Sequence, residues 1–388
     1  MKNKSYAFLS GLIAAVVIVV LQIITKQTLF VPNPYNSYML QARAWLDGRL
    51  DLGMDYPYLE LAIYNSKYFV SFPPFPSYVM LPFAALGFYG CDTFIAFISA
   101  VLGAVYSYKL AAEFTDENEA LFWAMFVTIG SNVLFTSVNA WVWFIAQNLA
   151  FTLTVSAFYY AARGNAGAAF TLWACAVGCR PFQIIYIVVV LYLLCGVYKR
   201  QNPSDGIFDM IKKHIFSVTG ACCVAVSYML LNYMRFGNIF EFGHNYLPEF
   251  TRVETGQFNL VYIKQNFKNL FRLPMIVNGK IEFQNGDGFC MFIASPIIIS
   301  FFAYWLTAQK KDRFVFSTAM ALFWLHLIMI TAHKTMGGAH YGNRYVNDTL
   351  PLILAVLAAY AKPHKINFIP FLLGLSLNIY WILKFFCQ

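Results

Sequence analysis

The chain has 388 residues, of which 60% are hydrophobic and only 12% are charged, and its mean hydropathy is +0.58. Soluble domains carry about 25% charged residues, so this composition excludes an ordinary soluble protein and predicts an integral membrane protein. The formal net charge of +9 lies mainly in short loops between apolar runs, which excludes a nucleic-acid partner and indicates topology signals instead.

The first apolar run covers residues 6–24 and follows Lys2 and Lys4. A run of about 20 apolar residues can cross the hydrocarbon core of a bilayer, and basic residues favour the cytoplasmic side. The run ends without the small-residue cleavage site of a signal peptide. We therefore expect a retained signal anchor, a cytoplasmic N-terminus and a multi-pass protein of the plasma (inner) membrane.

Further apolar runs follow along the rest of the chain. They cover residues 75–90, 92–112, 120–136, 139–162, 165–180, 181–199, 215–235, 287–306, 314–332, 346–361 and 366–386. The basic loops near residues 199, 310 and 362 are expected in the cytoplasm. A single transmembrane domain, residues 1–388, would then expose three extracytoplasmic loops, at residues 26–72, 236–286 and 333–345.

One of these runs is not expected to cross the membrane. An odd number of crossings must separate the first outer loop from the basic loop near residue 199, but the number of apolar runs between them is even. The segment Phe72–Phe83 (FPPFPSYVMLPF) is rich in proline, which removes backbone donors that lipid cannot replace. We predict a re-entrant segment there and about eleven spans in an all-α polytopic fold.

The first extracytoplasmic loop begins with an amphipathic pattern. Apolar side chains recur at positions 35, 38, 39, 42, 45 and 46, and Gly48 follows. This i, i+3, i+4 spacing predicts a helix that lies along the membrane surface and ends at the glycine. The large first loop is therefore expected to contain surface helices.

Carboxylates end or follow this predicted helix. Asp47 and Asp51 lie close to arginines and are expected mainly to solvate the loop. Asp55 and Glu60 lie among tyrosines and leucines, where an aromatic lid would disfavour the charged form and suit a carboxyl group to accept a proton. The alternative, that these two also merely solvate the loop, stays open.

Potential cations lie at span ends and in the outer loops. Arg180 precedes a proline at a membrane boundary, a costly position unless the side chain is paired or faces a ligand. His244 follows Glu241 in the second loop. Arg344, in the third, would bind a phosphate with both arms of its guanidinium or pair with Asp348 one turn later. The histidines lack metal-motif spacing, so no metal site or cofactor is predicted, although a divalent cation is compatible with the sequence.

Acids and cations on one face of a membrane suit a transferase that uses a lipid-phosphate sugar donor. A carboxylate would deprotonate the acceptor hydroxyl, cations would stabilise the departing lipid phosphate, and aromatic rings would stack on sugars. No convincing nucleotide-binding loop is present. The alternative is a transporter or flippase of a lipid-linked glycan, for which polar residues at mid-depth in broken helices and repeated halves are typical.

Short segments at the predicted outer face carry a family resemblance. They are Ala42–Leu52, Tyr64–Pro76, Arg180-Pro181, Arg235–Tyr246 and Gly342–Pro351. Together they resemble the GT-C superfamily of polyprenyl-phosphate-sugar glycosyltransferases, and more closely a bacterial branch related to the dolichyl-phosphate-mannose protein mannosyltransferases. The resemblance implies a GT-C fold, a donor of the undecaprenyl-phosphate-sugar type, and a glycan, lipid or protein acceptor in the cell envelope.

The resemblance also guides the assignment of site residues. Many members of the family have an acidic pair a few residues after the first span, whereas the similar position here is Asn36-Ser37. We therefore assign the catalytic base to Glu60, with Asp55 second. Donor-phosphate binding is assigned to Arg180, His244, Arg344 and Lys67. Supporting roles are assigned to Asp51, Glu241, His340 and Tyr345.

Overall fold

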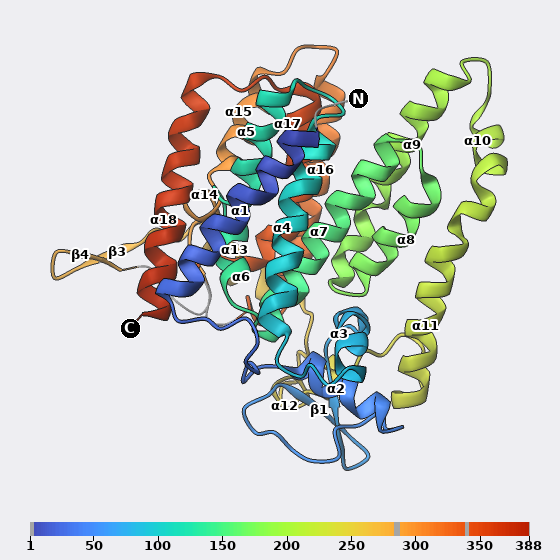
Figure 1. Ribbon diagram of the computed structural model, residues 1–388, viewed down its shortest axis with the longest axis vertical. Helices are drawn as coiled ribbons and strands as arrows, with labels where there is room; N and C mark the ends of the chain where they lie inside the picture. Colours follow the sequence, from blue (N-terminus) through green and yellow to red (C-terminus); the bar gives the residue numbers. More distant parts are fainter. Residues whose placement is uncertain (1–3, 283–287, 338–340, 388) are drawn as a thin grey trace. The chain divides into compact units, whose positions relative to one another are not determined.

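The computed structural model describes residues 4–282, 288–337 and 341–387, and these residues are predominantly helical (Figure 1). The chain divides into two compact units. Unit 1 comprises Met1–Gln27, Phe97–Val138 and Asn259–Gln388, and unit 2 comprises Thr28–Ala96 and Asn139–Phe258. Helix α4 (Asp92–Ala111) contributes residues to both.

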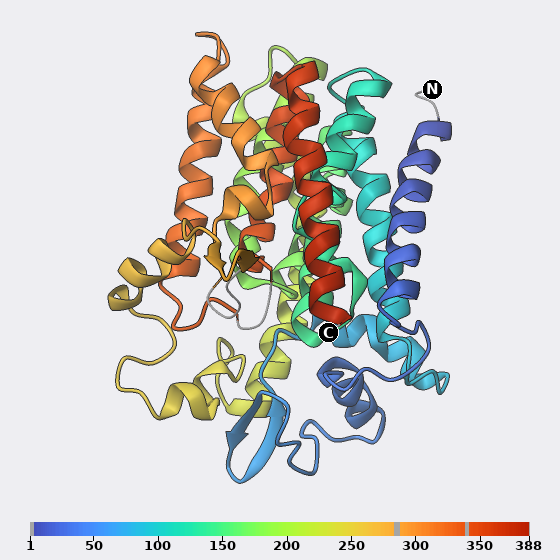
Figure 2. The same ribbon diagram turned by 90° about the vertical axis from the view of Figure 1, so that its left-hand side faces the viewer.

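Unit 1 contains helices from the N-terminal, central and C-terminal parts of the chain. Besides most of α4, its elements are α1 (Lys4–Ile24), α5 (Glu117–Thr128), α6 (Val133–Val138), η4 (Leu260–Tyr262), α13 (Ile263–Asn269), β3 (Met275–Val277), β4 (Lys280–Glu282), α14 (Met291–Ala294), α15 (Ile297–Thr307), α16 (Arg313–Thr331), η5 (Arg344–Thr349), α17 (Leu350–Tyr360), η6 (Lys365–Asn367) and α18 (Phe368–Phe386). Helix α1 packs on α5 and α6, and α18 packs on α6, α14 and α15 (Figure 2).

Unit 2 combines a short strand pair with helices of the central part of the chain. Its elements are α2 (Ser37–Leu46), β1 (Leu61–Tyr64), β2 (Lys67–Val70), α3 (Phe75–Ala85), α7 (Val142–Ala162), α8 (Ala166–Val177), η1 (Pro181–Tyr186), α9 (Ile187–Gln201), α10 (Ile207–His214), η2 (Ile215–Val218), α11 (Thr219–Phe236), η3 (His244–Tyr246) and α12 (Pro248–Thr251). The α, β and η elements are each numbered in chain order, and η denotes a 3-10 helix.

Among the described residues, 7 helices are long and apolar enough to cross a membrane. They are Lys4–Ile24, Asp92–Ala111, Val142–Ala162, Pro181–Gln201, Phe208–Phe236, Arg313–Thr331 and Lys365–Phe386. Each corresponds to an apolar run of the sequence, which confirms the polytopic helical fold. The other predicted spans form shorter helices. Helix α3 has 11 residues, rises only about 16 Å and cannot cross alone, but α15 and α17 have the same length, so the re-entrant segment stays a prediction.

The shorter helices of unit 1 arise where apolar runs break. The run at 120–136 divides into α5 and α6, and the run at 287–306 divides before Pro296. Asn132 connects the two breaks, because its backbone N–H donates to Ser295 Oγ at 3.1 Å and its Nδ2 donates to the Tyr341 carbonyl at 2.8 Å. Asn347 Nδ2 in turn donates to Asn132 Oδ1 at 3.3 Å. Such side-chain bonds replace helical ones where lipid cannot.

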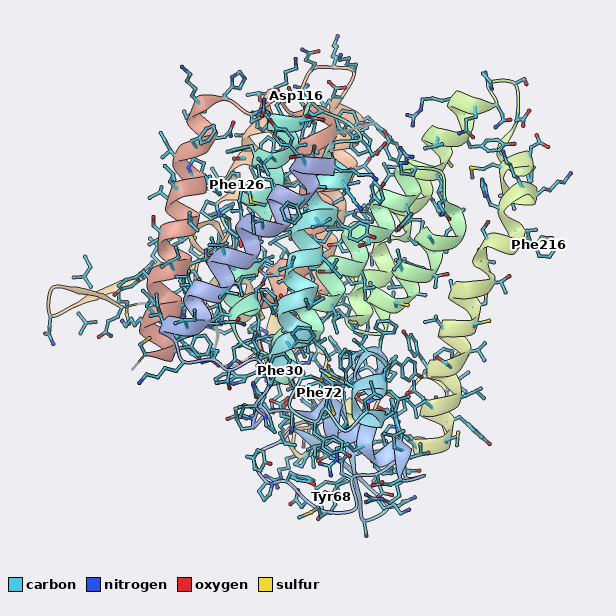
Figure 3. The ribbon with its side chains drawn as sticks, viewed as in Figure 1. Phe30, Tyr68, Phe72, Asp116, Phe126 and Phe216 are labelled. Carbon is cyan, nitrogen blue, oxygen red and sulfur yellow. The ribbon has the colours of Figure 1, made fainter. Side chains whose placement is uncertain are left out.

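A side-chain cap explains where the first of these broken runs begins. Asp116, labelled in Figure 3, accepts hydrogen bonds at Oδ1 from the backbone N–H groups of Asn118 and Glu119, each at 3.0 Å. This is the preferred arrangement at a helix N-cap, because it satisfies donors that the first turn leaves unpaired. Helix α5 therefore starts at Glu117, before the apolar run itself.

The first predicted loop folds differently from the expectation in one respect. Helix α2 is present and ends before Gly48, which has a φ of +70°, as predicted. Its apolar face is buried within unit 2, however, since Tyr38, Met39 and Ala42 are at most 1% exposed. The helix therefore presents that face to protein rather than to a membrane surface. The strand pair β1–β2 that follows was not predicted.

Candidate functional site

The first and second predicted outer loops meet at the end of β2, in a stretch that we call the Val70–Phe72 segment. Arg235, in the last turn of α11, donates from Nη1 to the Val70 carbonyl at 3.0 Å. His244, at the start of η3, lies with Nδ1 2.6 Å from the Ser71 carbonyl. One side chain at the end of α11 and one from the second loop therefore contact consecutive carbonyls of the first loop.

The Val70–Phe72 segment is positioned by a tight β-hairpin. β1 and β2 pair antiparallel with Leu61 opposite Val70, and the two turn residues, Asn65 and Ser66, have φ values of 49° and 59°. Positive φ at both central residues is characteristic of a type I′ turn, which matches the twist of paired strands. Beyond the strands, Ser71 Oγ donates to the Glu60 carbonyl at 3.2 Å, so Glu60 is tied to the same segment.

Arg235 is almost fully buried, at 4% exposed. Its Nη2 donates to Asn232 Oδ1 at 2.9 Å, and its guanidinium lies 4.9 Å from the centre of the Phe236 ring. The Nε has no hydrogen-bond partner among the described residues. From the sequence, Arg235 is a cation near the end of a span that would suit a phosphate, but it is not among the assigned site residues. Its position at the end of an apolar run, where an unpaired charge is costly, is the signal that identifies it.

The turn that carries His244 is held by Glu241. Its Oε1 accepts from the Gly243 N–H at 2.6 Å, and its Oε2 accepts from Asn245 Nδ2 at 2.7 Å. Gly243 has a φ of +103°, and a Cβ at this position would lie 2.9 Å from Phe236 Cζ. Glycine is required by both the backbone conformation and the space. Glu241 acts here by shaping a turn, and the supporting role assigned to it from the sequence stays a prediction.

The His244 ring has apolar neighbours and one nearby cation. Its centre lies 5.7 Å from that of Phe72, which is labelled in Figure 3, and 6.2 Å from that of Phe250. Burial lowers the pKa of His244 below its ordinary value, and the charge of Arg180 lowers it further. The hydrogen bond to Ser71 and the charge of Glu241 act in the opposite direction without reversing the shift.

Arg180 follows α8, and two contacts fix the backbone just before it. The Phe75 N–H donates to the Gly178 carbonyl at 3.0 Å, which joins the end of α8 to the start of α3. A Cβ on Gly178 would lie 2.0 Å from Tyr228 Oη, so α11 approaches this point closely. These contacts fix the backbone next to Arg180, whose charge helps to lower the pKa of His244.

Glu60 and Asp55 are both exposed, so the aromatic lid predicted over them is wrong. Both residues precede the first strand of the hairpin, β1. Glu60 nevertheless has an aromatic partner, since Trp143 Nε1 donates to its Oε2 at 3.1 Å. The Trp143 ring in turn lies 5.3 Å from that of Tyr35. The sequence did not predict this contact.

The other acids of the first loop form surface ion pairs. Lys67 Nζ lies 3.5 Å from Asp51 Oδ2, and Asp51 Oδ1 also accepts from the Gly53 N–H at 2.8 Å. Arg49 Nη2 lies 3.2 Å from Asp47 Oδ2. Asp47 therefore solvates the loop as predicted. Lys67, assigned to the donor phosphate from sequence, has a carboxylate partner in this structure.

The remaining predicted residues belong to unit 1 or lie outside the described residues. Arg344 is 1% exposed, and its Nε and Nη2 donate to the Gly337 carbonyl at 3.2 and 2.8 Å. Its guanidinium lies 4.7 Å from the centre of the Tyr345 ring. A backbone carbonyl was not among the two partners predicted for Arg344. His340 lies outside the described residues.

No family model matches the chain. No curated protein matches it either. Among the described residues, no group of three or more His, Cys, Asp or Glu side chains is arranged to hold a metal ion. Solved structures, unlike family models and curated proteins, do match the chain.

Those structures are membrane glycosyltransferases. ArnT from Cupriavidus metallidurans bound to undecaprenyl phosphate matches with a TM-score of 0.55 and 13% identity, over 94% of this chain and 62% of that one. Its apo form matches with a TM-score of 0.53 and 12% identity, over 97% and 63%. The oligosaccharyltransferase AglB from Archaeoglobus fulgidus matches with a TM-score of 0.48 and 12% identity, over 98% and 55%. This chain spans less than two thirds of each of these neighbours, and over most of its own length it shares the fold of ArnT.

Proposed function

We propose that the protein is a membrane glycosyltransferase that moves a sugar from a polyprenyl-phosphate donor to an acceptor hydroxyl. The observation that carries the proposal is that Arg235 and His244 contact the Val70–Phe72 segment and that the charge of Arg180 acts on His244, so two guanidinium cations belong to this region of a chain with the GT-C fold. Cations beside a membrane-embedded fold suit a lipid whose headgroup carries a phosphate. The undecaprenyl phosphate bound to ArnT is consistent with such a ligand.

The reaction makes defined demands on the site. The acceptor oxygen forms a bond to the anomeric carbon while the bond from that carbon to the phosphate oxygen breaks, and polyprenyl phosphate departs with the bonding electrons. Negative charge therefore grows on the phosphate, where a guanidinium stabilises it. Arg180 is the phosphate ligand favoured by this arrangement, and Lys67 and Arg344 remain proposals from the sequence. A proton acceptor completes the site, with Glu60 and then Asp55 as the sequence-based candidates.

The membrane placement is proposed from the basic loops. A cytoplasmic N-terminus in the plasma membrane would put residues 26–72, 236–286 and 333–345 on the extracytoplasmic side. A sugar donor carried by a lipid suits that side, because it needs no soluble nucleotide. The acceptor would be a glycan, a lipid or a protein of the cell envelope, and a divalent cation is an optional component.

The test combines binding with turnover. The protein is reconstituted in nanodiscs with a panel of radiolabelled polyprenyl-phosphate monosaccharides and envelope extracts, and bound polyprenyl phosphate is measured by native mass spectrometry. Arg180→Ala should lower transfer about 100-fold and weaken lipid binding. Arg252→Ala removes an exposed arginine of the same unit and should change neither. Absence of both binding and transfer in the wild type would overturn the proposal.

A lipid flippase is the second candidate, and the broken helices of unit 1 favour it. Buried Asn132, Asn347 and Ser295 lie at those breaks, as in the discontinuous helices of transporters. Their side chains bond to one another or to backbone, however, which is what a structural joint requires. Movement of whole donor lipid across a vesicle membrane without a new glycosidic bond would favour the flippase.

A further inference from the structure

The hydrogen bond at His244 defines which ring nitrogen carries a proton. Nδ1 lies 2.6 Å from the Ser71 carbonyl oxygen. A carbonyl has no proton to give, so the ring must donate, and Nδ1 therefore carries hydrogen. In the neutral ring Nε2 is then an acceptor with a free lone pair. Only a protonated ring can donate from Nε2 to a phosphate oxygen, so the charge of the ring decides its role.

The surroundings of the ring favour its neutral form. Burial is the largest cause that lowers the pKa of His244 below the ordinary 6.5, and Arg180 adds to it. The charged groups that act on the ring are Arg180 and Glu241, and Glu241 is engaged by the Gly243 N–H and Asn245. The aromatic rings that contact it are apolar, since Phe250 stacks on it with an interplanar angle of 21° and Phe72 meets it at 73°.

We infer that His244 is the proton acceptor of the transfer reaction, taking the place assigned to Glu60, and is not a ligand of the donor phosphate. This inference rests on the proposed function. As the acceptor oxygen bonds to the anomeric carbon, its proton moves to His244 Nε2 and the ring becomes an imidazolium. The phosphate leaves with the electron pair of the broken bond, and the imidazolium returns its proton to solvent before the next turnover.

Charge complementarity supports this assignment over Glu60. A carboxylate beside a lipid phosphate would repel it in the ground state. A neutral imidazole does not repel the phosphate, and it becomes positive while negative charge grows on the leaving group, so the attraction develops in the transition state. Glu60 is also exposed and accepts a hydrogen bond from Trp143, which positions it to bind a hydroxyl of substrate or solvent.

The kinetic test uses His244→Asn. The asparagine amide reaches the position of Nδ1 and retains a donor for Ser71, but it cannot accept a proton. We expect kcat to fall about 10²- to 10⁴-fold with little change in the KM of the donor lipid. The wild-type kcat should fall with acid on a limb below pH 6.5, and the variant should lack that limb. His364→Asn removes an exposed histidine and should behave as wild type.

Two kinetic outcomes would overturn the inference while leaving the transferase in place. One is a raised donor KM with an unchanged kcat in His244→Asn, as expected if the ring binds phosphate. The other is a loss of kcat in Glu60→Gln as large as that in His244→Asn, whereas we expect less than tenfold. A wild type without transfer or lipid binding would instead remove the proposed function.

A second measurement is independent of activity. Diethyl pyrocarbonate modifies neutral imidazole but not imidazolium, and its reaction at His244 can be followed by peptide mass spectrometry as the pH is varied. Exposed His364 in the same digest serves as the internal control. We expect half-maximal reaction of His244 below pH 6.5. A midpoint at or above that value would show a ring that is readily charged and would overturn its role as proton acceptor.

Discussion

Arg235 in unit 2 and Arg344 in unit 1 are buried in similar ways. Both donate to a backbone carbonyl, Val70 or Gly337, and both lie over the ring of the residue that follows them. They differ in how far along the chain the carbonyl partner lies. Arg344 bonds to a residue 7 positions away, whereas Arg235 bonds to one 165 positions away. The first orders its own loop, and the second joins two loops that the sequence separates widely.

This difference shows where the chemistry of unit 2 comes from. The Val70–Phe72 segment is contacted by Arg235 from the end of α11 and by His244 from the second loop, and Ser71 bonds to the Glu60 carbonyl of the first loop. In unit 1 the buried polar groups at the helix breaks bond to one another. Long-range bonds in unit 2 therefore bring together residues of the proposed site, whereas those in unit 1 satisfy polar groups at helix breaks, which lipid could not hydrogen-bond.

The largest expected effect is the loss of stability on replacing Arg235, and it distinguishes this arginine from Arg344. Arg235→Met leaves the Val70 carbonyl and Asn232 Oδ1 without their donors in a buried place, which should cost roughly 2–4 kcal/mol of stability. Thermal unfolding in detergent would measure it. The reaction of His244 with diethyl pyrocarbonate should also quicken, because the segment that its ring contacts is released.

Arg344→Met is the matched comparison. It also removes a buried guanidinium that holds a carbonyl, so it should destabilise the protein by about 1–3 kcal/mol. It should leave the reaction of His244 unchanged, because the carbonyl that it holds, Gly337, belongs to unit 1 and not to the Val70–Phe72 segment. Equal acceleration in both variants would show that the two regions do not differ as described. Arg235→Lys, with one donor group left near Val70, should lie between Arg235→Met and wild type.

A smaller effect is expected from Gly243→Ala. A β-carbon at a φ of +103° is strained, and this one would lie 2.9 Å from Phe236 Cζ. We expect a loss of about 1–2 kcal/mol, measured by thermal unfolding, and a displaced His244. Gly237→Ala provides a control, since Gly237 also has positive φ but no atom within 4 Å of the added carbon. If the Gly237 variant lost more transfer activity, placement of His244 would not be the cause.

Local patterns predicted much of the fold. Apolar runs identified the long helices, and the spacing of residues 35–46 identified α2, because these features follow from periodicity and composition. The breaks at Asn132 and Ser295 escaped prediction for a physical reason. Their stability depends on hydrogen bonds between segments more than 160 residues apart, which no window of the sequence contains.

The site was predicted less completely for the same reason. Arg180, Glu241 and His244 were identified as polar groups near span ends, but the role of Arg235 depends on a carbonyl in the first loop. The lid over Glu60 was inferred from neighbouring tyrosines and leucines, whereas its aromatic partner, Trp143, comes from the start of α7. Neighbours in the sequence therefore did not predict which aromatic side chain contacts this loop carboxylate.

Trp143→Phe tests that long-range contact at an exposed position. It removes the N–H that donates to Glu60 Oε2 and keeps an aromatic ring beside Tyr35. Because solvent can replace the lost bond, we expect a stability loss of about 0.5–1 kcal/mol, measured by thermal unfolding. Transfer should fall only severalfold if Glu60 binds a hydroxyl. A loss comparable with that of His244→Asn would return the role of base to Glu60.

The smallest effect is expected at the Lys67–Asp51 pair. Lys67 is 62% exposed, and ion pairs at such positions contribute about 0.2–1 kcal/mol that salt screens. Lys67→Ala should therefore shift thermal unfolding slightly at low salt and not at high salt, with donor KM nearly unchanged. Asp51→Asn should have a similar effect on stability. If Lys67→Ala instead raised the donor KM tenfold while Asp51→Asn did not, Lys67 would exchange its carboxylate partner for the lipid phosphate. The boundary of the site would then extend from the Val70–Phe72 segment to the tip of the hairpin.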